Sequence, residues 1–130
     1  MKIMVCYDGT EPAKRAVRLA GDQAVAFGGQ VKIVRTLEKG TPDHQDDINE
    51  ANRELEYMKG VVTQKGVDCS CDLLIRGLEP GEDLIQFAKD RQIDLMVIGI
   101  VRKSKVGKLF FGSTAQYVIL KAPCPVLTVR

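Results

Sequence analysis

The sequence of 130 residues has no tryptophan, one histidine and only 5% aromatic residues, and its formal net charge is +2. A charge so close to zero does not produce the basic surface that nucleic acids or anionic membranes attract, so we expect neither as a partner. The longest apolar runs, residues 3–7 and 95–100, are far shorter than the roughly 20 residues that cross a bilayer. Asp8 and Gly9 end the first run before it reaches the length found in signal peptides. We therefore expect a cytoplasmic protein.

The single histidine and the four cysteines do not form a recognisable catalytic or metal site. No Ser–His–Asp or Cys–His arrangement can be assembled around His44, and no carboxylate resembles a poised general base. Cys69 and Cys71 share one face of a predicted strand, but no further Cys or His pair completes a tetrahedral zinc site. A chain of this length buries a core without disulfides, so we interpret the cysteines as buried thiols. We expect neither a metal site nor a dedicated enzyme.

Strand and helix patterns alternate along the whole chain. Apolar or alternating runs predict strands at residues 2–7, 31–37, 69–75, 95–99 and 126–130. Helical spacing or helix-start signals predict a helix in each segment between two strands. A polar loop at 38–47 precedes the second helix, and a basic loop after residue 99 precedes the last one. This order predicts one doubly wound α/β domain over residues 1–130. We expect a five-stranded parallel sheet in the order 3-2-1-4-5, with four helices on its two faces.

The segment from Gly99 to Thr114 has the sequence GIVRKSKVGKLFFGST and is typical of a phosphate-binding loop. Glycine allows the backbone to approach a ligand closely, and the N–H groups of a helix's first turn attract anions. Ser113 and Thr114 are expected to cap the helix that follows Gly112, and their hydroxyls are suited to phosphate. Arg102 stands where a second glycine would be most useful. A strand followed by a solvated basic loop and an ordinary helix is the alternative interpretation.

The chain resembles the universal stress protein family over essentially its whole length. The resemblance is carried by the opening MKIMVCYDGTEPAKRAVRLA, the strand and glycine LMVIG, and the ending GSTAQYVILKAPCPVLTVR. It implies a doubly wound sheet of five parallel strands, commonly a homodimer, with an ATP site in one branch of the family. That branch has Gly, two residues, Gly, nine residues, and then Gly followed by Ser or Thr. Gly99, Gly112 and Ser113 match this pattern, whereas Arg102 replaces the middle glycine.

Carried over residue by residue, the resemblance implies an adenine-nucleotide site at the carboxyl ends of the first and fourth strands. Asp8 would face the ribose or the adenine, and the backbone of Val34 would meet the adenine edge. Cys6 and Tyr7 would end the first strand beside the base. The residues expected at the ribose and phosphates are Gly99, Gly112, Ser113 and Thr114. The implied ligand is ATP. Carboxylates such as Asp8 are suited to hold Mg²⁺ on its phosphates.

Two residues of this site have alternative interpretations. Arg102 either obstructs the loop or replaces a lost backbone contact with a charged one. Asp8, which precedes a glycine at a strand end, also fits a residue that only stabilises the turn into the next helix. The leading hypothesis is a nucleotide-responsive regulatory dimer with at most slow, incidental ATP hydrolysis. The alternative is a family member that binds no nucleotide and acts through protein contacts alone.

The final strand, from Val126 to Arg130, is the predicted dimer interface. It lies at an edge of a sheet with the expected order and carries Val126, Leu127 and Val129 with one terminal charge. An edge strand leaves a row of backbone groups unpaired, and two such edges related by a two-fold axis pair antiparallel. A monomer whose edge is shielded by Arg130 and the turn at Pro123–Pro125 is the alternative.

Overall fold

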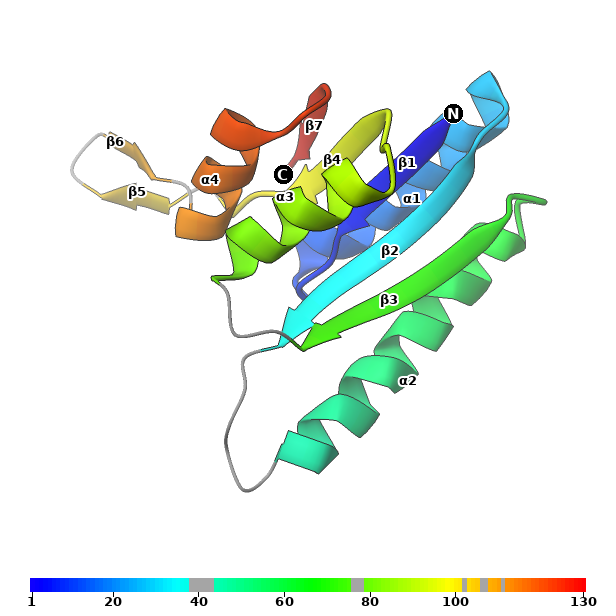
Figure 1. The fold of residues 1–130 in the computed structure, drawn as a ribbon, viewed down its shortest axis with the longest axis horizontal. Helices are drawn as coiled ribbons and strands as arrows, with labels where there is room; N and C mark the ends of the chain where they lie inside the picture. The colour runs from blue at the N-terminus through cyan, green and yellow to red at the C-terminus, as the bar shows by residue number, and fades with distance from the viewer. Residues whose placement is uncertain (38–43, 76–78, 102, 106–107, 111) are drawn as a thin grey trace.

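The computed structural model of the chain describes residues 1–37, 44–75, 79–101, 103–105, 108–110 and 112–130. Five parallel strands form one sheet in the order β3-β2-β1-β4-β7 (Figure 1). Because β7 is the fifth strand of this sheet along the chain, the predicted order 3-2-1-4-5 is confirmed. The strands are β1 (Lys2–Cys6), β2 (Gln30–Leu37), β3 (Cys69–Ile75), β4 (Leu95–Gly99) and β7 (Val126–Val129).

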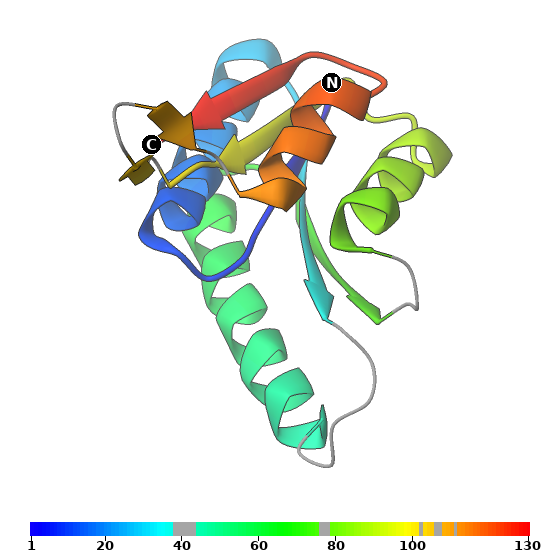
Figure 2. The same ribbon diagram turned by 90° about the vertical axis from the view of Figure 1, so that its left-hand side faces the viewer.

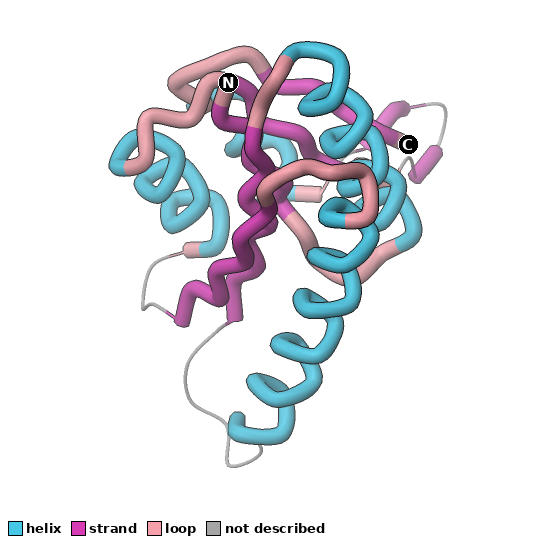
Figure 3. The backbone as a smooth tube through the Cα atoms, turned by 90° about the vertical axis from the view of Figure 1, so that its right-hand side faces the viewer, coloured by secondary structure: helices cyan, strands magenta, loops and turns pink. Residues whose placement is uncertain are grey.

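Two helices cover each face of the sheet, and the predicted four helices on its two faces are confirmed. One face carries α1 (Glu11–Phe27) and α2 (His44–Thr63), and the other carries α3 (Pro80–Asp90) and α4 (Ser113–Lys121) (Figure 2). In Figure 3 the long helix α2 runs beside the strand pair β2 and β3. None of the helices in the described ranges combines the length and the apolar character needed to cross a membrane.

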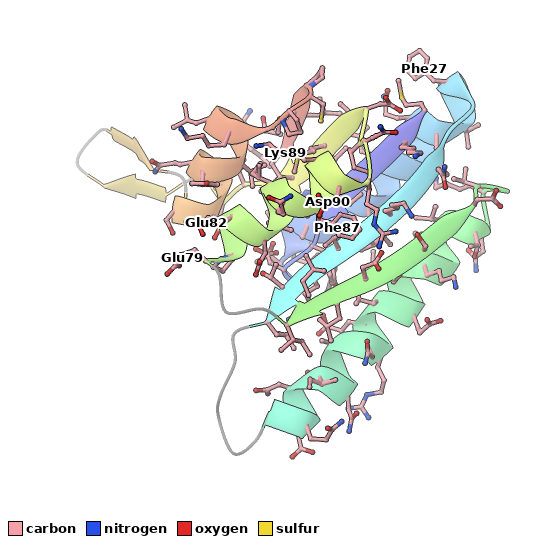
Figure 4. All side chains as sticks on the ribbon, in the orientation of Figure 1. Phe27, Glu79, Glu82, Phe87, Lys89 and Asp90 are labelled. Atoms are coloured by element: carbon pink, nitrogen blue, oxygen red, sulfur yellow. The ribbon has the colours of Figure 1, made fainter. Side chains whose placement is uncertain are left out.

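Alternation along the strands divides the buried side chains between two cores. Ile3 and Val5 of β1 pack with α1 and α2, whereas Met4 and Cys6 pack with α3 and α4. Phe87 lies in the second core, on the side of α3 that faces the sheet (Figure 4). Glu79 lies at the N-terminal end of this helix. A ligand site bounded by α3 and α4 is therefore built on the second core.

Local sequence signals set the ends of α1 and α3. The Thr10 hydroxyl accepts a hydrogen bond from the Ala13 amide at 3.3 Å, and Pro12 occupies the first turn. Gly28 ends α1 with a φ of 70°, a left-handed conformation that favours glycine. Pro80 is the first residue of α3, as its missing N–H predicts.

The structure differs from the expectations at three places. Helix α2 begins at His44, inside the predicted loop, because Asp46 and Asp47 in its first turn complement the helix dipole. The basic segment contains two short antiparallel strands, β5 (Lys103–Lys105) and β6 (Lys108–Phe110), whose pairing satisfies backbone groups that a loop leaves to water. The helical spacing of Ala115, Val118 and Ile119 predicts that all three face inward from α4, but Ile119 is 38% exposed.

Candidate functional site

A cavity of about 370 Å³ opens at the carboxyl ends of β1, β2 and β4, between the starts of α3 and α4. This is the point at which the strand order reverses, where doubly wound sheets bind ligands. Its volume lies within the range of small-molecule sites. Arg102, the eighth predicted site residue, lies outside the described residues. The structure brings the other seven to this one cavity: Tyr7, Asp8, Val34, Gly99, Gly112, Ser113 and Thr114.

The inner part of the cavity is an apolar slot. Val34, Leu84, Ile98 and Ala115 line it from β2, α3, β4 and α4, and each is at most 7% exposed. Apolar walls of this kind suit a flat ring system, with specificity left to a few polar groups. The slot therefore provides a place for a heterocyclic base next to the helix end.

Several lining residues were not predicted from the sequence. Thr36 is two residues beyond Val34 on β2, so period-2 alternation was a signal for it. Pro80 and Leu84 belong to α3, whose start reaches the cavity only because the crossover from β3 returns over this face of the sheet. Their positions depend on tertiary packing, for which the local sequence carries no signal.

Among the described residues, no side chain caps the start of α4. Gly112 is the N-cap residue, with φ −59° and ψ 154°, and it makes no side-chain cap hydrogen bond. The expectation that Ser113 and Thr114 cap the helix was wrong, because both lie inside it. Uncapped first-turn N–H groups and the helix dipole favour an anion at this position. Within the described part of the chain, a Cβ atom built on Gly112 meets nothing within 4 Å, so packing among these residues does not require glycine there.

Gly99 has a different reason to be glycine. It ends β4 beneath the start of α1, where a Cβ would lie 2.5 Å from both the Ala13 nitrogen and the Pro12 carbonyl carbon. A side chain at this position would push α1 away from the sheet. Gly99 thus lines the cavity while maintaining close packing between strand and helix.

Asp8 stabilises the turn between β1 and α1. Its Oδ1 accepts hydrogen bonds from the Thr10 amide at 3.0 Å and the Thr10 hydroxyl at 2.6 Å. The turn role that the sequence left open is therefore present. The exposed Asp8 side chain also borders the cavity, so the same carboxylate is available to a ligand through Oδ2.

Tyr7 and Val34 are linked through their backbones. The Tyr7 amide donates to the Val34 carbonyl at 2.9 Å, which leaves the second lone pair of that carbonyl for a ligand. The ring of Tyr7 packs in the core of α1 and α2, away from the slot. Its hydroxyl lies 3.5 Å from Glu54 Oε2, and Arg35 Nη1 donates to the same carboxylate oxygen at 2.6 Å. Burial, and then the Glu54 charge, raise the pKa of Tyr7, so the phenol stays neutral.

Cys6 lies at the cavity wall as a protonated thiol. Burial raises its pKa from 9.0 to about 12, and the nearby Cys124 and Asp8 add to this shift. A thiol in this state is a poor nucleophile. Cys6 therefore provides an apolar surface to the cavity.

The carboxylates of the described residues provide little for a metal ion. Within these residues no group of three or more His, Cys, Asp or Glu side chains is arranged to hold one. Mg²⁺ bound to a nucleotide needs only one or two protein carboxylates besides the phosphates. Asp8 fits this lesser role and no larger one.

Comparison with known protein families and sequences identifies relatives of a single family. A model of the universal stress protein family matches residues 1–130. A universal stress protein of Thermus aquaticus, encoded in the 3′ region of a QAH/OAS sulfhydrylase, is 38% identical, with 98% of this chain and 97% of the relative aligned.

Two solved structures from Archaeoglobus fulgidus show the same fold. A universal stress protein structure has a TM-score of 0.88 and 34% identity, covering 100% of this chain and 93% of that one. A universal stress protein in complex with dAMP has a TM-score of 0.82 and 33% identity, covering 100% of this chain and 98% of that one.

Proposed function

Since the chain belongs to the universal stress protein family, we propose that it is a regulatory protein that binds an adenine nucleotide, ATP, in the cavity beside β1 and β4. The observation that carries this proposal is the apolar slot adjoining the uncapped start of α4. The slot accepts the base, and the helix N-terminus accepts phosphate. The dAMP complex of a relative with 33% identity supports an adenine nucleotide as the ligand class.

In the proposed complex, the base lies against Val34, Leu84 and Ile98. The ribose faces Asp8, and the phosphates lie over Gly112 and the first turn of α4. Among the described residues that line the cavity, Asp8 is the only carboxylate, and we propose that binding, and not turnover, produces the regulatory signal. Mg²⁺, when bound with ATP, would neutralise phosphate charge, with Asp8 as its protein ligand.

Calorimetric titration with ATP and Mg²⁺ tests the proposal, with GTP as the comparison nucleotide. We expect heat of binding for ATP and a matching rise in melting temperature. Gly112→Val should abolish both effects, because a branched side chain would occupy the space where phosphate meets the backbone. Gly60→Val is the matched control, since Gly60 lies in α2, far from the cavity, and its Cβ position is equally open.

Absence of heat and of a thermal shift at millimolar ATP would refute nucleotide binding and favour the alternative of a family member that acts through protein contacts alone. Equal loss of binding in both glycine variants would refute the assigned phosphate position.

The variant Arg102→Gly tests the role of the basic loop in ATP binding. We expect it to tighten ATP binding, because glycine restores the pattern of the ATP-binding branch, and weaker binding would assign Arg102 to the phosphates.

We further propose a homodimer joined through residues 126–130. The structure has β7 at the edge of the sheet, with Val126, Leu127 and Val129 partly exposed. Arg15 Nε donates to the Arg130 carbonyl at 2.7 Å, which ties the end of the chain to α1 beside this edge. A second copy related by a two-fold axis would pair with the open side of β7.

A further inference from the structure

Cys69 and Cys71 lie together at the outermost strand of the sheet. They begin β3, their side chains are partly exposed, and both pack against the core that α2 covers. The Cys71 thiol lies 3.3 Å from the Leu55 carbonyl oxygen of α2 and donates to it. The pair is on the opposite face of the sheet from the slot formed by Leu84 and Ala115. It therefore belongs to no part of the nucleotide cavity.

We propose that Cys69 and Cys71 form a two-coordinate binding site for a soft, thiophilic cation such as Cu(I). Soft thiolate ligands favour such ions over hard cations. The described residues contain no cluster of three or more His, Cys, Asp or Glu side chains. The four ligands of a tetrahedral zinc site are therefore not available among these residues. An ion that needs only two thiolates finds both of its ligands here.

The spacing of the two residues favours a shared metal ion over a disulfide. Two residues of a strand advance about 6.6 Å, and side chains i and i+2 leave the same face nearly parallel. A disulfide needs Cβ atoms about 3.5–4.5 Å apart, which this backbone does not provide without moving. Two metal–sulfur bonds of about 2.3 Å, the length found in zinc thiolates, hold sulfurs up to about 4.6 Å apart. The two side chains lie on the same face of β3 and interact with one another, so one ion can be shared between them.

The surroundings of the pair lower the pKa of Cys69. The interaction with Cys71 is the main cause, and the charges of Lys59 and Lys32 add to it, against burial and the charge of Glu56. The same interaction raises the pKa of Cys71. Binding of Cu(I) displaces both thiol protons: two thiols and Cu⁺ give a bis-thiolate complex of charge −1 and two H⁺. Copper stays in the same oxidation state.

An anaerobic titration of the reduced, full-length protein with Cu(I), in competition with a chromophoric Cu(I) chelator, tests the site. We expect one equivalent to bind. Cys69→Ser and Cys71→Ser should each weaken binding at least about 100-fold, because each leaves a single thiolate. Cys124→Ser is the matched control: Cys124 is also partly exposed and unpaired, and its replacement should leave the affinity unchanged.

Thermal unfolding without metal tests whether the serine variants are folded. In the presence of Cu(I), only the wild type and Cys124→Ser should gain stability. Failure of the wild-type protein to compete with the chelator would overturn the proposal. So would an affinity that Cys69→Ser or Cys71→Ser leaves intact, or that Cys124→Ser lowers as much as they do.

Discussion

Gly99, at the end of β4, lies directly against Ala13 in the first turn of α1: a Cβ atom on Gly99 would be 2.5 Å from the Ala13 nitrogen. No real Cβ approaches backbone so closely, and α1 cannot shift without losing its contacts with the sheet. Gly112, in the same cavity, has no described atom within 4 Å of its Cβ position. The two glycines that match the sequence motif therefore serve different purposes. Gly99 is required by the packing of the fold, and Gly112 by the proposed ligand.

This contrast predicts opposite outcomes for two alanine variants. Gly99→Ala should lower the free energy of unfolding by about 1–3 kcal/mol, the usual cost of overpacking. Gly112→Ala should change it by less than about 0.5 kcal/mol, as for other open positions. Urea denaturation of both variants gives the two values. Equal stability of the variants would show that α1 adjusts to the extra methyl group without cost.

Two variants of Asp8 should separate its turn role from its charge. Asp8→Asn keeps an acceptor for the Thr10 amide and hydroxyl, so the free energy of unfolding should change by less than about 0.5 kcal/mol. Asp8→Ala loses both hydrogen bonds and should cost about 1 kcal/mol. Both variants should weaken ATP binding in the presence of Mg²⁺, because both lack the carboxylate. If Asp8→Asn binds as tightly as the wild type, the role of Asp8 is confined to the turn.

The backbone of β7 specifies which proline substitution tests the dimer. The backbone amides of Met96 and Ile100 donate to the carbonyls of Pro125 and Val129, so these carbonyls point towards β4. Because backbone groups alternate along a strand, the N–H and C=O of Leu127 also point towards β4. The amide of Thr128 therefore points away from β4. Thr128→Pro should abolish a dimer built on this edge while leaving the ladder to β4 intact. Leu127→Pro should instead destabilise the domain itself.

Analytical ultracentrifugation at micromolar concentration measures the first effect, and thermal unfolding measures the second. A wild-type monomer would contradict the interface. A Thr128→Pro protein that still sediments as a dimer would require a different contact surface.

Cys6 should make stability depend on alkaline pH. Its pKa is about 12 in the folded protein and 9.0 for a free thiol, so the folded state keeps a proton that the unfolded state loses. This contribution to stability is fully present below pH 9 and is lost as the pH rises from 9 towards 12. The free energy of unfolding should fall there by at most about 1.4 kcal/mol per pH unit from this group.

Cys6→Ala removes the titrating group and should flatten this part of the profile. The raised pKa of Tyr7 acts in the same direction but is common to both proteins, so it cancels in the comparison. Urea denaturation between pH 8 and 11 measures the slopes. Identical slopes would show that the Cys6 thiol titrates alike in the folded and unfolded chains.

Patterns of local sequence were sufficient to predict most of the fold. Helical spacing from Ala13 to Ala24, with Pro12 before it and Gly28 after it, predicts α1 because each signal acts within a few residues. The apolar run of β4 likewise predicts a central strand. The start of α2 was misplaced, because acidic residues such as Asp46 suit a polar loop and a helix's first turn equally well.

The sequence by itself determined the order of strands and helices and the parallel sheet, since strand ends and short turns are local properties. The seven predicted residues that reach one cavity came from the resemblance of its motifs to the universal stress protein family. Only the tertiary structure decided what surrounds them. Leu84 and Thr36 join the cavity, and Tyr7 turns its ring towards Glu54, through packing between segments far apart in the chain. The reason that Gly99 must be glycine also lies in another element, because a close approach of two backbones exists only once β4 and α1 have packed together.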